Sequence, residues 1–148
     1  VARFGVPCVL MHMRGDPATM QDRPVYQDLW DDLKTFFRER IKAAAAAGID
    51  PDAIIIDPGI GFGKTLEHNL EIIARLDRLA RLGRPVLIGP SRKSFIGMIT
   101  GRPPQERLWG TAAAVSASIF GGVHILRVHD IEKIKDVVSV TDRILEYK

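Results

Sequence analysis

Ile54-Ile55-Ile56-Asp57-Pro58-Gly59-Ile60-Gly61-Phe62-Gly63-Lys64-Thr65 is an apolar run that ends in a carboxylate and then breaks into a glycine-rich turn. Three consecutive β-branched residues predict a strand that is buried on both faces, and Pro58 with Gly59 ends it. Asp57 is therefore expected at the carboxyl end of the strand, the edge where parallel α/β folds bind ligands. The alternative is that Asp57 only caps the turn by accepting backbone N–H bonds.

Two phosphate-binding motifs come close to this loop but do not match it. A Walker A loop requires glycine where this chain has Pro58, and a dinucleotide fingerprint requires a wider last spacing than the alternating glycines provide. The loop still offers a carboxylate, three glycines that let a ligand approach the backbone closely, Phe62 to cover a flat ring, and Lys64.

Composition favours one globular domain, because the chain has 148 residues of which 46% are apolar. Its 21 basic and 18 acidic residues are interspersed, which argues against a nucleic-acid partner. The single cysteine, Cys8, lies in an apolar run, so we expect it to be a small core residue. Because it cannot form an internal disulfide, we expect a protein of the reducing cytoplasm. No signal peptide or membrane span is predicted. The chain opens without methionine close to a strand, so we expect other residues to precede it.

Hydrophobic periodicity predicts strands that alternate with helices. The expected strands are 6–13, 54–57, 85–89 and 123–128. The expected helices are 29–44, 66–79, a short one within 94–97, 111–120 and 131–144. A loop is expected from 14 to 27.

This order implies a parallel sheet with right-handed crossovers, either as an open doubly wound sheet or as part of a (β/α)₈ barrel. Barrels run to about 250 residues, so this chain corresponds to roughly half of one. In both architectures the residues that follow the strands meet at one edge, and they are polar. They are Met11, His12 and Arg14, then 57–64, then 91–94, then 127–130. The sequence thus predicts a shared ligand site.

Four of these segments, taken together, resemble one enzyme family. The segments are Met11-His12-Met13-Arg14-Gly15, the 57–64 loop, Gly89-Pro90-Ser91-Arg92-Lys93-Ser94 and Arg127-Val128-His129-Asp130. They look like the C-terminal half of dihydropteroate synthase, and the resemblance covers essentially the whole chain. It implies that residues 1–148 are four consecutive βα units of a pterin-binding (β/α)₈ barrel, the C-terminal half barrel, whose N-terminal half is absent.

The resemblance also implies an activity in folate biosynthesis. The family condenses 6-hydroxymethyl-7,8-dihydropterin diphosphate with 4-aminobenzoate, releases diphosphate and uses Mg²⁺. Asp57 and Lys93 match its catalytic residues. The same two, with Met11 and Gly61, match the pterin contacts, although a methionine in an apolar strand also fits a core position. Asp57 would accept two hydrogen bonds from the amino-pyrimidine edge of the pterin.

The other family contacts match residues at the remaining strand ends. Arg127 and His129 match the diphosphate-binding pair, with a cap of the last helix as the alternative role of His129. Phe62, Lys93 and Ser94 match the 4-aminobenzoate site, which is also the target of sulfonamides. The metal-binding asparagine of the family belongs to the absent half, so no metal ligand is expected in this chain.

Several residues have no assigned ligand role. His12 and Arg14 are left open between structural and binding roles, whereas Cys8, His68 and His124 are interpreted as structural.

Two other functions remain as alternatives. One is a related pterin-binding methyltransferase, which shares the barrel but does not need the anion pair. The other is a non-catalytic half barrel that acts as an interaction unit. The expected partners are the small-molecule substrates, with no nucleic acid and no membrane. Self-association as a homodimer is expected as well, because the first and last strands of a half barrel have open edges.

Overall fold

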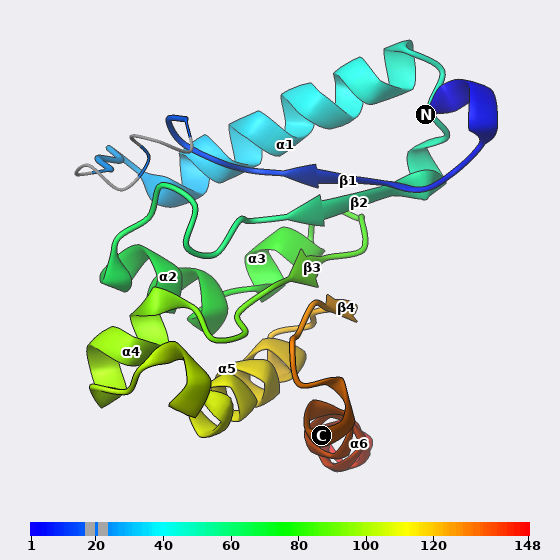
Figure 1. The fold of residues 1–148 in the computed structure, drawn as a ribbon. Coiled ribbons are helices and arrows are strands. Elements are labelled where there is room, and N and C mark those ends of the chain that lie inside the picture. Colours follow the sequence, from blue (N-terminus) through cyan, green and yellow to red (C-terminus); the bar gives the residue numbers. More distant parts are fainter. Residues whose placement is uncertain (17–19, 21–23) are drawn as a thin grey trace.

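The computed structural model describes residues 1–16, 20 and 24–148 (Figure 1). The strands are β1 (Cys8–Met11), β2 (Ile54–Asp57), β3 (Leu87–Ile88) and β4 (Ile125–Leu126). The helices are α1 (Leu29–Ala46), α2 (Leu66–Ala74), α3 (Asp77–Ala80), α4 (Ser94–Thr100), α5 (Leu108–Phe120) and α6 (Ile131–Leu145). Three 3-10 turns, η1 (Ala2–Phe4), η2 (Pro51–Ala53) and η3 (Pro104–Glu106), complete the order. The predicted 14–27 loop lies partly outside the described residues.

The strands follow one another in the order of the sequence. β1 pairs in parallel with β2, β3 pairs in parallel with β4, and a parallel bridge from Ile56 to Val86 joins the two pairs. The paired segments are shorter than the predicted strands. Backbone bonds nevertheless continue beyond them, since the His12 N–H donates to the Asp57 carbonyl at 2.9 Å and the Arg127 N–H to the Ile88 carbonyl at 3.0 Å. The prediction of four parallel strands is confirmed.

The two faces of β2 differ in burial. Ile54 and Ile56 are fully buried, whereas Ile55 and Asp57 are half-buried. Successive side chains of a strand point to opposite faces, so only the Ile54 face is covered by the core. The prediction of a strand buried on both faces is therefore wrong for the face that carries Asp57. Met11 is the partner of Asp57 in the β1–β2 register and lies beside it on this face.

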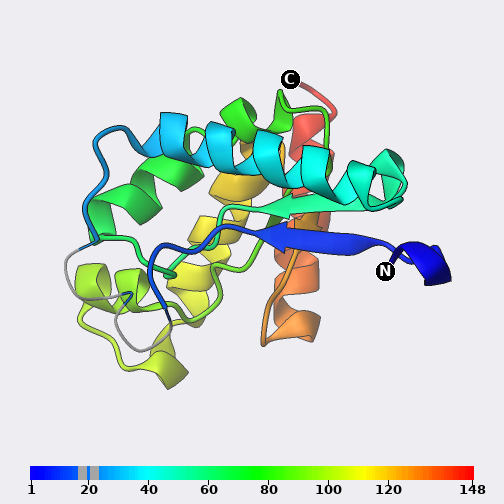
Figure 2. The same ribbon diagram turned by 90° about the horizontal axis from the view of Figure 1, so that it is seen from above.

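Helix α1 packs its apolar stripe on the sheet, as predicted from its periodicity. Its N-terminus is capped by Asp28, whose carboxylate accepts from the backbone N–H groups of Trp30 and Asp31. Leu33 and Phe37 are fully buried. In Figures 1 and 2, α1 runs along β1 and β2, and α5 and α6 lie side by side next to β4. No helix of the described residues is long and apolar enough to cross a membrane.

Two predictions about packing are wrong. The expected single helix 66–79 is divided into α2 and α3 at Arg75, whose φ is −131°. The division places fully buried Leu76 against Gly121, where an added Cβ would lie 2.9 Å from the Leu76 Cβ. Cys8 is half-buried instead of a core residue, because β1 is at the edge of the described sheet.

Candidate functional site

The loop after β2 is pressed against the segment that follows β1. Gly59, Gly61 and Gly63 all have positive φ, between 64° and 80°. A Cβ on Gly59 would lie 2.0 Å from the His12 carbonyl oxygen, and one on Gly63 would lie 2.3 Å from that of Arg14. Side chains at these two positions would overlap with backbone, so glycine is required by space as well as by conformation.

Asp57 ends β2 at the start of this loop. Its Oδ1 accepts from the Gly59 N–H at 2.7 Å, so the turn-capping role considered from the sequence is real. Burial raises the pKa of Asp57 above its usual value, and the Gly59 N–H together with Lys64, Lys93 and Arg127 opposes that rise. A carboxylate has two oxygens, which allows capping and ligand binding together.

Lys93 reaches across the loop from the other side. Its Nζ lies 4.1 Å from the centre of the Phe62 ring, a cation–π contact. Its Cδ is 3.2 Å from the position of a Cβ on Gly61, so the chain packs closely over that glycine. Burial lowers the pKa of Lys93, while Asp57 raises it and Arg127 lowers it. The structure thus brings Asp57 and Lys93 together with Phe62, as the sequence predicts.

Lys64 and His12 form a buried pair beneath the loop. The two side chains are 3% and 6% exposed, and Lys64 Nζ lies 3.0 Å from His12 Nδ1 and donates to the Phe62 carbonyl at 3.1 Å. Desolvation lowers the pKa of Lys64 to about 7 against the opposing effect of Asp57. Desolvation and then Lys64 lower the pKa of His12 to about 4, so His12 is neutral near pH 7.

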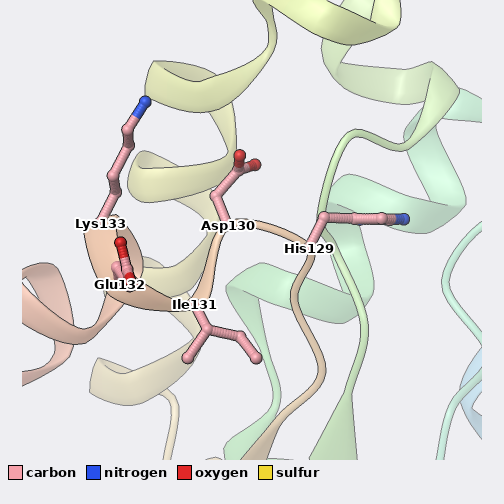
Figure 3. A pocket seen from close by; sticks show the side chains of 5 residues that line it. All are labelled: His129, Asp130, Ile131, Glu132 and Lys133. Carbon is pink, nitrogen blue, oxygen red and sulfur yellow. The ribbon is translucent and has the colours of Figure 1, made fainter.

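Ser91 connects the loop after β3 to the segment after β4. It is 4% exposed, its hydroxyl lies 2.9 Å from His129 Nδ1, and it accepts from the His129 N–H at 3.2 Å. His129 also lines a pocket of about 300 Å³ with the first turn of α6. Figure 3 shows its ring directed away from the Lys133 side chain. His129 is held by Ser91 and is not the cap of α6.

Arg92 holds the same two segments together. It has a φ of 56° although it is not glycine, and its guanidinium donates to both carboxylate oxygens of Asp130, at 2.6 and 3.0 Å. Its N–H donates to the Thr111 hydroxyl, and its carbonyl accepts from Arg107, each at 3.0 Å. A strained backbone persists where the surrounding contacts fix it, and here these contacts come from Thr111 of α5 and from Arg107 and Asp130, the residues that precede α5 and α6.

The remaining predicted site residues are accessible. Met11 is 37% exposed, which excludes the core alternative, and its Cγ lies 3.5 Å from the Cβ position of Gly59. Arg127 is exposed after β4, and Ser94 is exposed at the start of α4.

The structural assignments are confirmed for two histidines. His68 accepts from the Thr65 N–H in the capping box of α2, and His124 accepts from the Val86 N–H. Arg14, which was left open, is exposed and pairs with Asp32 at 2.6 Å.

Several residues that shape the site had no specific contact predicted from the sequence, although Lys64 was among the groups that the loop was expected to offer a ligand. They are Lys64, Asn69, Ser91, Arg92 and Arg107. Three of them could have been found from the sequence, because Lys64 follows the glycine run and Ser91 and Arg92 precede Lys93. Nothing local marks Asn69 or Arg107, whose partners are remote in sequence or require the folded turn.

The low pKa of Lys64 predicts how stability depends on pH. A lysine in the unfolded chain keeps its ordinary pKa of 10.5, whereas Lys64 in the fold has a pKa of about 7. Between these values the unfolded chain binds more protons, so the free energy of unfolding rises with pH, by up to about 1.4 kcal/mol per unit. Below pH 7 both states hold the proton and this contribution is constant.

The measurement is urea unfolding of this chain at pH 7, 8 and 9. In Lys64→Met the free energy of unfolding should no longer rise with pH. In Lys42→Met, which changes an exposed lysine on α1, the rise should remain. The same pH slope in all three proteins would contradict the inferred cost of charging Lys64.

A family model described as pterin binding enzyme matches residues 1–129 of this chain. The dihydropteroate synthase of Synechocystis is 47% identical over 142 residues, which are 95% of this chain and 49% of that protein. The Escherichia coli dihydropteroate synthase is 40% identical over 147 residues, which are 99% of this chain and 52% of that protein.

A solved structure shows the same similarity in three dimensions. The Yersinia pestis dihydropteroate synthase, solved in complex with a sulfonamide drug, superposes with a TM-score of 0.97 at 39% identity and covers 99% of this chain and 54% of its own. The α/β fold described above is thus that of dihydropteroate synthase structures. The chain spans about half the length of the curated relatives it matches, 49% and 52% for the two above.

Proposed function

Because this chain belongs to the family of pterin-binding enzymes, we propose that the protein that contains it is a dihydropteroate synthase, a transferase of folate biosynthesis. The observation that carries the proposal is the convergence of half-buried Asp57 with Lys93 and Arg127 at the carboxyl ends of three parallel strands. The test is an assay of the complete protein for dihydropteroate formation from the pterin diphosphate and 4-aminobenzoate. A protein that binds pterin without forming this product is instead the methyltransferase type or a non-catalytic unit.

The architecture we propose is a half barrel. Residues 1–148 are taken as four consecutive βα units of a (β/α)₈ barrel, with the N-terminal units supplied by the rest of the protein. The strand order β1-β2-β3-β4 supports this, because a barrel sheet proceeds without reversal, whereas a doubly wound sheet has a switch point.

The pterin site is proposed on the open face of β1 and β2. Asp57 would accept from the amino-pyrimidine edge of the pterin, with Met11 and Gly61 beneath and beside the ring and Lys93 donating to ring acceptors. The aminobenzoate nitrogen then bonds to the pterin methylene carbon while the C–O bond to diphosphate breaks, and the amine releases one N–H proton to solvent. Positive charge that develops on the pterin is stabilised by the Asp57 carboxylate, so Asp57 and Lys93 act as catalytic residues.

The diphosphate site is proposed at Arg127 and His129. Ser91 occupies Nδ1 of His129, which leaves Nε2 as the ring nitrogen for an anion.

Magnesium does not fit the side chains of this chain by itself. Within residues 1–16, 20 and 24–148, no group of three His, Cys, Asp or Glu side chains is placed to hold a metal ion. Asp130, the carboxylate that follows His129 in the chain, is bonded to Arg92 through both oxygens. Magnesium as a cofactor is kept as a proposal from the resemblance, and no step of the mechanism is assigned to it.

The 4-aminobenzoate site is proposed between Phe62, Lys93 and Ser94. Lys93 and Phe62, which are in cation–π contact, form one wall of this site. Ser94 is exposed at the first position of α4, where its hydroxyl can donate a hydrogen bond to the carboxylate of 4-aminobenzoate. The Thermus thermophilus dihydropteroate synthase was solved in complex with 4-aminobenzoate, and it is 42% identical, with a TM-score of 0.90, over 97% of this chain and 59% of its own.

The anion and aminobenzoate sites should be separable by mutation. In the complete protein, Arg127→Ala with His129→Ala should weaken diphosphate binding about tenfold or more, because charged hydrogen bonds are lost. Ser94→Ala should weaken the binding of 4-aminobenzoate and sulfonamides by about fivefold and leave diphosphate binding unchanged. Calorimetric titration of each variant with each ligand measures this. Equal losses for both ligands in all variants would show that the assignment of the two sites is wrong.

Self-association is proposed for the 148-residue chain on its own. Val9 on β1 and Ile125 on β4 are 45% and 37% exposed, and both strands lie at the ends of the described strand order. Open edges with apolar side chains pair with other strands, so sedimentation should show dimers or larger species. Val9→Lys should reduce association relative to Lys42→Met. A chain that stays monomeric at high concentration would refute the edge argument.

The cellular setting follows from the same proposal. We place the complete protein in the cytoplasm, where the single Cys8 stays reduced. Its proposed partners are the small substrates and a second copy, with no nucleic acid and no membrane.

A further inference from the structure

Lys64 is a buried lysine with no place in the mechanism above. Only 3% of it is exposed, and burial of a lysine is unfavourable unless its nitrogen is used in hydrogen bonds. Its Nζ is used in two, with the Phe62 carbonyl at 3.1 Å and His12 Nδ1 at 3.0 Å. Because Lys64 is enclosed, its role is not direct contact with substrate.

The loop around Phe62 is held residue by residue. The Gly61 N–H donates to Asn69 Oδ1 at 2.8 Å, the Phe62 carbonyl accepts from Lys64, and the Gly63 carbonyl accepts from the Tyr26 hydroxyl at 2.8 Å. Three successive loop residues are thus bonded to side chains from α2, from the loop itself and from the segment before α1. Such a pattern fixes a backbone that glycine alone leaves free.

The far end of the Lys64 contact is rigid. His12 is 6% exposed, and its ring packs edge-on against Phe36, with 5.0 Å between ring centroids, and at a tilt of 42° against Tyr26, with 6.1 Å between centroids. The backbone N–H of His12 donates to the Asp57 carbonyl, at the end of β2. Lys64 therefore ties the Phe62 peptide to the sheet and to the face of α1.

We propose that Lys64 is a positioning residue for Phe62, and through it for the aminobenzoate site. Phe62 stands between two glycines of positive φ. Its N–H donates to the Gly59 carbonyl at 3.0 Å, whereas the Lys64 bond holds the next peptide plane, at the Phe62 carbonyl, so loss of the Lys64 bond would let that plane rotate. Rotation would move the ring from Lys93, which lies 4.1 Å away. The inference rests on the proposed function for its substrate, but the restraint on the loop does not.

The first test uses the complete protein and steady-state kinetics. Lys64→Met should raise the KM for 4-aminobenzoate about tenfold, because a buried hydrogen bond that holds one wall of that site is lost. The KM for the pterin diphosphate should stay within about twofold, and Lys42→Met should change neither. An equal rise in both KM values would overturn the proposal.

A double-mutant cycle separates positioning from general destabilisation. In a Phe62→Ala background, Lys64→Met should have little further effect on the KM for aminobenzoate, because the ring that it positions is gone. Additive effects would contradict the proposal. If Lys64→Met does not fold, His12→Phe carries the test, since it keeps the ring packing and removes the Nδ1 partner. It should raise the same KM, to a smaller extent.

Hydrogen exchange of the 148-residue chain tests the restraint without any activity. The amides of Gly61, Phe62 and Gly63 should exchange faster in Lys64→Met than in the parent chain or Lys42→Met, while those of α1 are unchanged. Unchanged loop exchange overturns the inference even if the enzyme is active. Faster loop exchange in a protein that forms no dihydropteroate would leave the restraint standing and refute the proposed function.

Discussion

Asp57→Ala in the complete protein should lower kcat/KM for the pterin diphosphate by about a hundredfold to ten-thousandfold. Each hydrogen bond to a charged group contributes about 1.5 to 3 kcal/mol, and the proposed contact has two. In the proposed mechanism the carboxylate also stabilises the charge that develops as diphosphate leaves, so kcat should fall as well as affinity. Diphosphate alone should bind with nearly unchanged affinity, because the contacts proposed for it are Arg127 and His129.

Two further variants make this measurement specific. Asp57→Asn keeps the shape of the side chain and one acceptor oxygen, which can still accept from the Gly59 N–H. Its loss of kcat/KM should therefore be intermediate. Asp136→Ala, at an exposed aspartate of α6, should have no effect. Unchanged turnover and pterin affinity in Asp57→Ala would exclude this residue as the pterin carboxylate.

Gly59→Ala should destabilise the chain by about 3 to 5 kcal/mol. Part of the loss, about 1 to 2 kcal/mol, is the left-handed backbone at a φ of 69°. The rest arises because the new Cβ would lie 2.0 Å from the His12 carbonyl oxygen, which is backbone and cannot rotate away. The loop must then move off the segment after β1, so aminobenzoate affinity in the complete protein should fall too.

Gly83→Ala is the matched control for this prediction. Gly83 has nearly the same φ, 70°, and no atom within 4 Å of the added Cβ. Gly83→Ala should lower the free energy of unfolding only by the cost of the left-handed backbone, about 1 to 2 kcal/mol. Urea unfolding of the two variants measures the difference. Equal losses would show that the contact with His12 relaxes without cost.

Much of the fold follows from local pattern. The 3.6-residue period of 29–44 and the β-branched run at 54–56 each depend on neighbours in sequence, so their helix and strand are predictable. Placing Asp57 at a strand end needed only the Pro58-Gly59 break. The periodicity of 66–79 does not predict the division of the helix at Arg75, after which Leu76 lies against Gly121, a residue far along the chain.

The amino-acid sequence by itself determined the order of strands and helices, and the edge at which Asp57, Lys93 and Arg127 collect, because parallel strands bring their carboxyl ends together. Only the tertiary structure decided that Lys64 is buried against His12 and that Ser91 holds His129. The partners in these two contacts are 52 and 38 residues apart, and burial in a low-dielectric interior, not residue type, sets their bonding and the pKa of Lys64. Burial of a polar side chain such as that of Lys64 depends on the whole packed chain, so the local pattern, which predicts the burial of apolar stripes, does not report it.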